Sequence, residues 1–413
     1  MPLSKGLGAL QERDFRLLFA GTTITTMGDR LAGIALAFAV LDMASATALG
    51  IVFAVRQGVQ ALVVVGGGVL SDRIPRNLVL VGASLVQGTA QAATAACVLT
   101  GTGGVEAIVA LQAVYGIGLG LVLPAEVGLV PQTVSPARLQ QANALQGLSR
   151  NMIGVLGPAV GGVVVVASSP GIALAIDAVS FLFCADLLRR IRVAPRDASG
   201  SHGFVHELRE GWQEFTSRTW LWASVLLFGV GNLAFAGWIV LGPAVADERL
   251  GGAGAWAVIL TAGGVGAVIG GILAIRIRPR RPLVVCVLAA TLISLQTLAL
   301  ALSAPTALIA AASFVGGIGI AVHLTLWFTV FQQQVPEHAQ SRVASYDTLG
   351  SFILMPIGMA LVGPLADAIG IVETLWIALV VMWASWGRSC CCRPFGRSGG
   401  QRQCRRRAPL DPG

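Results

Sequence analysis

The sequence predicts an all-α integral membrane protein with twelve transmembrane helices in two six-helix pseudo-repeats, the last helix being short or degenerate. Hydrophobic residues make up 55% of the 413 residues and charged residues only 12%, about half the charged share of a soluble domain. Apolar stretches close to the roughly 20 residues that span a bilayer recur along the whole chain. The second half of the chain also echoes the first. These three observations exclude a water-soluble fold.

The helices are expected where apolar stretches lie between polar loops. The first six lie near residues 16–41, 46–70, 77–99, 105–128, 141–167 and 171–190. The second six lie near residues 219–245, 254–275, 282–302, 307–331, 343–366 and 371–387. The twelfth is the weakest, because only the 13 residues 374–386 are apolar enough for the bilayer and a span needs roughly 20.

The domain organisation follows from these segments. A polar linker separates the halves, and its second part places Phe204, Leu208, Trp212 and Phe215 on one helical face, a pattern typical of an amphipathic helix at a membrane interface. The predicted units are an N-terminal half at 1–190, a cytoplasmic linker with this interfacial helix at 191–218, a C-terminal half at 219–387 and an Arg/Cys-rich tail at 388–413.

The composition changes abruptly in the tail, which is rich in Arg, Gly, Pro and Cys. An out-of-frame end in GC-rich DNA would produce such a composition, and the chain as a whole has a single lysine, Lys5, against many arginines. A basic segment attracted to anionic lipid and an acylated cysteine cluster are the alternatives.

Basic residues predict the orientation in the membrane, because Lys and Arg are retained on the cytoplasmic side during insertion. With the N-terminus inside, 25 of the 28 Lys and Arg residues fall on the inner side. Arg249 alone falls outside, and Arg30 and Arg56 fall within predicted spans. We therefore expect a multi-pass protein of the inner (cytoplasmic) membrane with both termini in the cytoplasm.

An internal repeat relates the two halves. The loop after the second span reads GVLSDRIPR at 68–76, and the loop after the eighth reads GILAIRIRPR at 271–280. A second correspondence at nearly the same offset pairs Arg138 with Arg342. Two six-helix halves in parallel repeat are the plan of a rocker-switch carrier.

The loop after the second span also carries a family motif. Gly68, Asp72, Arg73 and Arg76 match the loop 2–3 signature of the major facilitator superfamily, which the chain resembles up to about residue 384. In that family the charged loop acts as a conformational latch. A carboxylate and guanidinium groups at a helix end can form a charge cluster with acids of neighbouring helices, and Glu126 is the expected partner. The alternative is a solvated turn that obeys the positive-inside rule.

A second motif refines the resemblance. The fifth span contains GPAVGG, similar to the GPxxGG motif of drug:proton antiporters, with Gly157, Pro158, Gly161 and Gly162 as the matching residues. Generic helix packing by small residues is the alternative reading. With QANALQ at 141–146 and ALVGPLADAIG at 360–370, the chain most resembles the efflux branch that contains the enterobactin exporter and macrolide-efflux-type proteins.

The resemblance implies a secondary active transporter, with proton-coupled efflux of amphipathic small molecules by alternating access as the expected function. An uptake permease of the same fold is the first alternative, and a membrane-embedded lipid-modifying enzyme is the second. The sequence favours no enzyme, because no loop carries a carboxylate pair, a His/Cys cluster or a nucleophile constellation. Lys5 is the only lysine, which excludes the phosphate-binding and kinase motifs of ATP-driven proteins.

Charged residues inside predicted spans are costly and therefore candidates for transport or for buried pairs. At a rise of 1.5 Å per residue, Asp29 lies roughly 18 Å and Arg56 roughly 15 Å below the outer ends of their spans. This near-equal depth predicts an ion pair, with Arg30 as the competing partner. A structural pair and a coupling or substrate-binding role are both open.

Three further polar residues are candidates. Asp177 lies in the outer part of the sixth span, where it either functions or extends its carboxylate to water. His323 either shuttles protons or is a satisfied core histidine, and Asp347 is expected at the N-terminal end of the eleventh helix, where it would stabilise the helix dipole. Trp238 and Trp327 either line a cavity or anchor helix ends at the interface.

The expected partners are a small-molecule substrate, protons and the lipid bilayer. Because the arginines lie in short loops between apolar spans, their distribution indicates membrane orientation and no nucleic-acid binding. The cysteines show no spacing typical of a metal site. We expect a monomer without a metal or a cofactor.

Overall fold

The structure is a computed structural model that describes residues 8–192, 212–277 and 279–391, with side chains described outside 65–73, 275, 337–342 and 386–391. All regular elements in these residues are helical. Those of the first half are η1 (Gly8–Gln11), α2 (Arg13–Met43), α3 (Ala46–Arg73), α4 (Arg76–Thr100), α5 (Gly104–Thr133), η2 (Pro136–Arg138), α6 (Leu139–Ala167) and α7 (Pro170–Arg189). Those of the second half are α9 (Thr219–Val245), η3 (Ala246–Leu250), α10 (Gly252–Arg276), α11 (Pro282–Ala301), α12 (Thr306–Gln334), α13 (Glu337–Phe352), α14 (Met355–Ile369) and α15 (Ile371–Cys391).

Helix ends coincide with residues that favour helix termination or initiation. The chain turns out of α4 at Gly101, whose φ of 67° lies in the left-handed region that glycine adopts without strain. Helix α7 begins after Ser169, whose hydroxyl accepts a hydrogen bond from the Ile172 amide at 3.3 Å, and Pro170 follows at the first helical position, where its missing N–H has no helical partner.

The predicted fold class is confirmed. Eleven segments of the described chain are helical, long and apolar enough to cross a membrane, and a shorter apolar helix at Ile371–Ser385 follows them. The last helix is therefore short in apolar length, as the sequence predicts.

The eleventh span covers Val343–Ile369, close to the predicted 343–366, but a short break divides it between two helices. The chain turns at Ile353 and Leu354, between α13 and α14. Pro356 stands at the start of α14, and a proline ring clashes with the carbonyl four residues earlier, which here belongs to Phe352. Helix α13 also begins at Glu337. Asp347 therefore lies in the interior of a helix, and the expectation that it caps the positive helix end is wrong.

The two halves have the same packing plan. In the first half α3 packs on α5, α4 packs on α5 and α7, and α2 packs on α6 and α7. The helices at the same positions in the second half repeat these pairs: α10 packs on α12, α11 packs on α12 and α15, and α9 packs on α14 and α15. The pseudo-repeat suggested by the loop motifs thus extends to the helix contacts.

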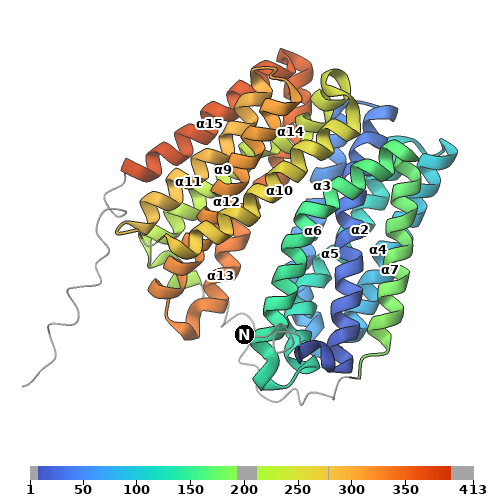
Figure 1. Cartoon of the computed structure of the whole chain (residues 1–413), viewed down its shortest axis with the longest axis vertical. Helices are drawn as coiled ribbons and strands as arrows, with labels where there is room; N and C mark the ends of the chain where they lie inside the picture. The colour runs from blue at the N-terminus through green and yellow to red at the C-terminus, as the bar shows by residue number, and fades with distance from the viewer. Residues whose placement is uncertain (1–7, 193–211, 278, 392–413) are drawn as a thin grey trace, which may run out of the picture.

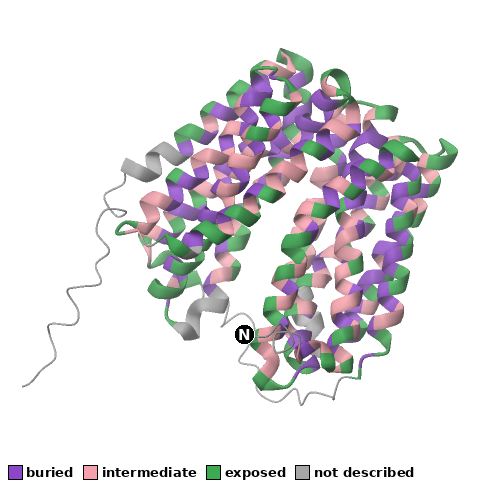
Figure 2. Cartoon of the chain, viewed as in Figure 1, coloured by how far each residue is buried: buried purple, intermediate pink, exposed green. Residues whose placement is uncertain are grey.

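The halves meet mainly through two helix pairs, α6 with α10 and α3 with α14. Figure 1 shows the two bundles converging at the end remote from the N-terminus and separating towards the end where the N-terminus lies. Buried residues are concentrated inside each bundle and where the bundles converge (Figure 2).

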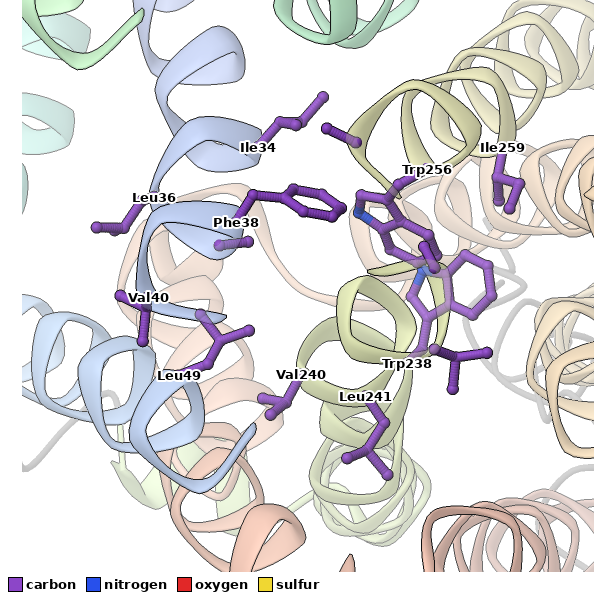
Figure 3. Close-up of a cluster of buried hydrophobic side chains, with 14 of the residues drawn as sticks. Ile34, Leu36, Phe38, Val40, Leu49, Trp238, Val240, Leu241, Trp256 and Ile259 are labelled. Atoms are coloured by element: carbon purple, nitrogen blue, oxygen red, sulfur yellow. The ribbon is translucent and has the colours of Figure 1, made fainter. Parts of the chain in front are cut away.

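A hydrophobic cluster closes the converging end. Its members come from both halves, and among them Phe38 of α2 points towards Trp256 of α10, beside Trp238 of α9 (Figure 3). These side chains are each 4% exposed. The molecule is therefore sealed on the side remote from the N-terminus.

The predicted interfacial helix is described only from residue 212 onwards, and Phe204 and Leu208 lie outside the described residues, as does most of the tail at 388–413. Trp212 and Phe215 contact Tyr346 of α13, with ring centroids 5.4 and 5.9 Å away. Phe215 is buried, whereas Trp212 stays about half exposed although it also contacts Tyr346. This segment therefore packs on the second half through both aromatic residues.

Candidate functional site

A cavity of about 710 Å³ lies between the two halves. Three charged residues line it, Asp29 and Arg30 of α2 and Arg150 of α6, all from the first half. Aromatic and amide side chains, including Trp256 and Gln296, line the wall of the second half. The volume falls within the usual range for small-molecule sites.

Asp29 is held by two neighbouring helices. Arg56 Nη2 of α3 lies 3.9 Å from Asp29 Oδ1, and the Tyr115 hydroxyl of α5 donates a hydrogen bond to the same oxygen. The Arg56 guanidinium carbon also lies 4.1 Å from the centre of the Tyr115 ring, within cation–π range. The structure thus brings together the two charges that the sequence pairs by depth. The energetic coupling between them stays a prediction.

The pair is partly accessible to solvent, and Asp29 lines the cavity. The Asp29 side chain is 30% exposed and that of Arg56 is 15% exposed, while Tyr115 is fully buried behind them. Asp29 therefore has a carboxylate held in place on one side and open to the cavity on the other. Such a group can exchange a proton with cavity water and can sense a bound molecule.

Asp177 lies inside the first bundle. It is fully buried, accepts a hydrogen bond from Gln91 Nε2 of α4 at 2.8 Å and lies 3.4 Å from the Ser180 hydroxyl. The sequence-based alternative that Asp177 extends to water is wrong, because α7 turns this residue towards α4 and towards Gly28 of α2. The carboxylate is one end of a polar chain within the bundle.

The hydrogen-bonded chain of polar side chains that starts at Asp177 continues through amide groups. Gln112 Nε2 of α5 lies 3.3 Å from both Gln91 Oε1 and Thr94 Oγ1, and all three residues are buried. Gln112 Oε1 has no hydrogen-bond partner within the described residues. Tyr115, Gln91 and Gln112 are not among the site residues predicted from the sequence. An available signal was that each is a polar-tipped side chain inside an apolar span.

Arg30 points into the cavity without a partner of its own. It is exposed on the cavity wall, and within the described part of the chain it makes no hydrogen bond or ion pair. Its aliphatic stem packs where Gly157 of α6 leaves room, since a methyl group on Gly157 would overlap it. Arg30 is therefore not the partner of Asp29 in this structure.

The predicted latch is described only in part. The side chains of Gly68, Asp72 and Arg73 lie outside the described residues. Arg76 Nη1 donates a hydrogen bond to the Gly128 carbonyl at 2.6 Å, which ties the start of α4 to α5. Glu126, the expected partner of the loop arginines, lies 3.4 Å from Arg150 Nη1 of α6.

The GPAVGG segment is a packing surface. Gly161 approaches α2 so closely that a methyl group would lie 3.0 Å from Leu31 Cα. Gly162 faces the other half, where a methyl group would overlap Ala257 of α10. Gly157 accommodates Arg30, as described above, and Pro158 lines the cavity. Three faces of one helical segment thus contact α2, α10 and the cavity.

His323 lies in α12, away from the charged wall. Its Nδ1 atom is 3.0 Å from the Cys286 carbonyl oxygen and 3.2 Å from Cys286 Sγ of α11. The ring also stacks edge-on against Phe228 of α9 at 4.9 Å. These partners favour the interpretation of His323 as a satisfied core histidine.

The two candidate tryptophans have different roles. Trp238 lines the cavity and lies 4.8 Å from Trp256, ring centre to ring centre, so it is not an anchor at a helix end. Trp327 is buried and donates a hydrogen bond from Nε1 to Asp347 Oδ2 at 3.1 Å. Asp347 Oδ1 has no hydrogen-bond partner in the described part of the chain.

Comparison with known proteins agrees with this architecture. A family model described as Major Facilitator Superfamily matches residues 18–359. No curated protein sequence matches the chain. Among the described residues, no group of three or more His, Cys, Asp or Glu side chains could hold a metal ion.

Solved transporter structures share the fold at low sequence identity. A bacterial homologue of the human lysosomal transporter Spinster, inward-facing and unoccupied, has a TM-score of 0.72 at 13% identity, covering 91% of this chain and 96% of its own. The nucleoside transporter NupG has a TM-score of 0.74 at 10% identity, covering 91% and 99%. A POT family transporter in complex with 5-aminolevulinic acid has a TM-score of 0.70 at 12% identity, covering 91% and 95%.

These neighbours and the family match indicate a multi-pass membrane transporter, which implies a small-molecule substrate and a lipid environment. With its paired six-helix halves and a cavity between them, the chain belongs to the Major Facilitator Superfamily.

Proposed function

We propose that the chain is a proton-coupled exporter of amphipathic small molecules that works by alternating access. One observation carries the proposal: the Asp29 carboxylate is paired with Arg56 on the wall of the cavity between the halves. Protonation of Asp29 would change the charge of a surface that a substrate in the cavity contacts, so proton binding and substrate binding can be linked. The resemblance of GPAVGG and the surrounding segments to efflux proteins supports export over uptake.

The proposed cycle uses the sealed and open ends of the cavity. In the state described here the substrate enters from the side where the N-terminus lies, which the distribution of basic residues predicts to be cytoplasmic. Rocking of the halves about the α6–α10 and α3–α14 contacts would separate the Phe38–Trp256 cluster and open the opposite side. Asp29 would then accept a proton from outside, and after the return it would release that proton to the cytoplasm.

We further infer that the loop of Gly68, Asp72, Arg73 and Arg76 biases this equilibrium as a latch. The bond from Arg76 to the Gly128 carbonyl supports a connection between this loop and α5. The Glu126–Arg150 pair lies beside it and connects α5 to the cavity helix α6. The protein is proposed to act as a monomer in the inner (cytoplasmic) membrane.

Reconstituted vesicles test the proposal with both directions of the proton gradient. Probes with cationic, neutral and anionic headgroups are offered to vesicles containing the wild type, Asp29→Asn or the matched control Asp247→Asn, which alters an exposed loop acid. An exporter that exchanges substrate for protons accumulates a probe when the lumen is acidic. We expect Asp29→Asn to reduce this accumulation at least tenfold and Asp247→Asn to leave it unchanged.

The opposite gradient separates the alternatives. Accumulation in vesicles with an alkaline lumen would identify the uptake permease of the same fold, in which substrate and proton enter together. Accumulation that does not respond to either gradient, or an Asp29→Asn variant with wild-type transport, would reject proton coupling through Asp29.

A further inference from the structure

We infer that the cavity binds amphipathic organic anions, with Arg30 contacting the anionic headgroup and the aromatic wall around Trp238 and Trp256 contacting the apolar body. The inference rests on the proposed function only in taking the cavity as the substrate site. It names a substrate class, which the proton-coupling argument leaves open.

The first step is the balance of charge on the cavity wall. Three charged residues line the cavity, and Arg150 is ion-paired with Glu126 while Asp29 is ion-paired with Arg56. Arg30 is the remaining one, and it makes no ion pair within the described residues. Counting each pair as neutral, the wall carries one uncompensated positive charge.

The second step is that Asp29 makes its ion pair with Arg56 and none with Arg30 within the described residues. One of its oxygens already receives the Tyr115 hydroxyl and faces Arg56. Arg30 is exposed in the cavity while its stem is fixed against Gly157. A guanidinium placed in this way has donors free for a carboxylate, sulfonate or phosphate, which it binds with two parallel hydrogen bonds.

The third step concerns the opposite wall. Among the residues of the second half whose side chains are described, those that line the cavity include no charged one. Trp238 and Trp256 lie 4.8 Å apart as a tilted pair, while Asn232, Gln296 and Ser313 supply neutral polar groups. A ligand charged at both ends would leave one charge without a partner, whereas an amphipathic anion matches both walls.

The cavity also discriminates against cations. Charges act strongly across a cavity with low-dielectric walls, so the uncompensated guanidinium repels a second cation and attracts an anion. A cationic ligand would have to displace Arg56 from Asp29, which strands a charge. We therefore expect the headgroup charge to determine affinity when the apolar body is held constant.

Three probes with one aromatic body test this expectation. Naphthalene-2-sulfonate, naphthalene-2-sulfonamide and naphthalen-2-ylmethylammonium are titrated calorimetrically into purified protein in nanodiscs, with empty nanodiscs subtracted and no ion gradient present. We expect the sulfonate to bind at least tenfold more tightly than the other two. Arg30→Gln should weaken sulfonate binding at least tenfold, and Arg30→Lys should retain part of the affinity.

The matched control is Arg249→Gln, the same substitution at an exposed arginine outside the cavity, and it should bind like the wild type. Arg30→Lys keeps the charge and guards against a folding defect in Arg30→Gln. The inference is wrong if the ammonium probe binds as tightly as the sulfonate, if Arg30→Gln keeps the wild-type affinity, or if the sulfonate does not bind. Sulfonate binding that depends on Arg30 without proton-driven transport would reject the proposed function and leave the anion site standing.

Discussion

Asp29 and Arg56 show how single residues can determine whether a charge is tolerated between membrane helices. The two groups are partly exposed to the cavity and lie 3.9 Å apart. Removing one of them leaves the other in a poorly hydrated site, whereas removing both leaves no uncompensated charge.

We expect Asp29→Asn and Arg56→Gln each to lower the unfolding temperature, and the double variant to recover much of the loss. The coupling energy should fall in the range of about 0.5–3 kcal/mol typical of residues in contact. Thermal unfolding of the four proteins in one detergent measures it. Additive losses in the double variant would show that the two charges act independently.

A second residue-scale prediction concerns pH. Glu12 precedes α2 and accepts hydrogen bonds from the Ser135 hydroxyl at 2.8 Å and from the Ser135 amide at 3.1 Å, and these bonds lower its pKa below the ordinary 4.5. A carboxylate with a lowered pKa stabilises the fold above its unfolded-state pKa, and that contribution is lost as the pH falls through the folded-state value.

Glu12→Gln should therefore lower the unfolding temperature at pH 7, and its difference from the wild type should shrink as the pH is taken below about 4.5. Ser135→Ala removes the hydroxyl that donates to Glu12 while keeping the carboxylate, and it should also weaken the pH dependence of the wild type. A Glu12→Gln difference that is constant with pH would contradict the prediction.

Some residues of the candidate site could be predicted from the sequence and others could not. Asp29 and Arg56 could be paired because a charge inside an apolar span is conspicuous and depth follows from residue counting. Tyr115 could not be assigned, because its approach to Asp29 depends on how α5 is rotated against α2 and α3. Asp177 was misjudged for the same reason: its depth suggested access to water, and the orientation of α7 denies that access.

At the scale of elements, the contact of α6 with α10 depends on a glycine. A methyl group on Gly162 would overlap Ala257 Cβ, and overpacking of this kind costs about 1–3 kcal/mol. Gly162→Ala should therefore destabilise the protein, or favour states in which the halves are apart on this side. Adding Ala257→Gly should reverse the effect, because it removes the methyl group that collides.

Gly147→Ala is the matched control on the same helix, since nothing lies within 4 Å of a methyl group there. It should be neutral or slightly stabilising, because alanine favours a helix over glycine by about 1 kcal/mol. Thermal unfolding and the labelling rate of a cavity cysteine measure both effects. Equal behaviour of Gly162→Ala and Gly147→Ala would show that the contact does not control the interface.

The elements themselves were largely predictable, because a bilayer imposes a length and a composition that can be counted along the chain. The break between α13 and α14 was not placed, although Pro356 was visible, because prolines inside other helices such as Pro124 and Pro158 leave them continuous. Whether a membrane helix continues past a proline depends on its neighbours, which the sequence does not show.

At the scale of the whole molecule, the two halves form a pseudo-repeat whose relative arrangement defines one state of the protein. The loop motifs predict the pseudo-repeat, and the helix contacts extend it over all twelve positions. The particular state, in which the halves converge around Phe38 and Trp256 and separate towards the N-terminus (Figure 1), is a property of the packing between the halves. A transporter that alternates between two states needs them to be close in free energy. The same sequence pattern is therefore compatible with either state and does not reveal which one is adopted.

The orientation can be tested on the two ends of α9, whose 27 residues extend about 40 Å. Ser217 precedes this helix and Glu248 follows it, and both are exposed. The asymmetry of 25 basic residues on one side against Arg249 on the other predicts that Ser217 lies in the cytoplasm and Glu248 outside. In a cysteine-free variant, Glu248→Cys should react with a membrane-impermeant maleimide in intact cells, whereas Ser217→Cys should react only in inverted vesicles. The reverse labelling pattern would mean that the molecule has the opposite orientation, so that the halves separate towards the outside. Labelling of both cysteines from one side would refute the transmembrane assignment of α9.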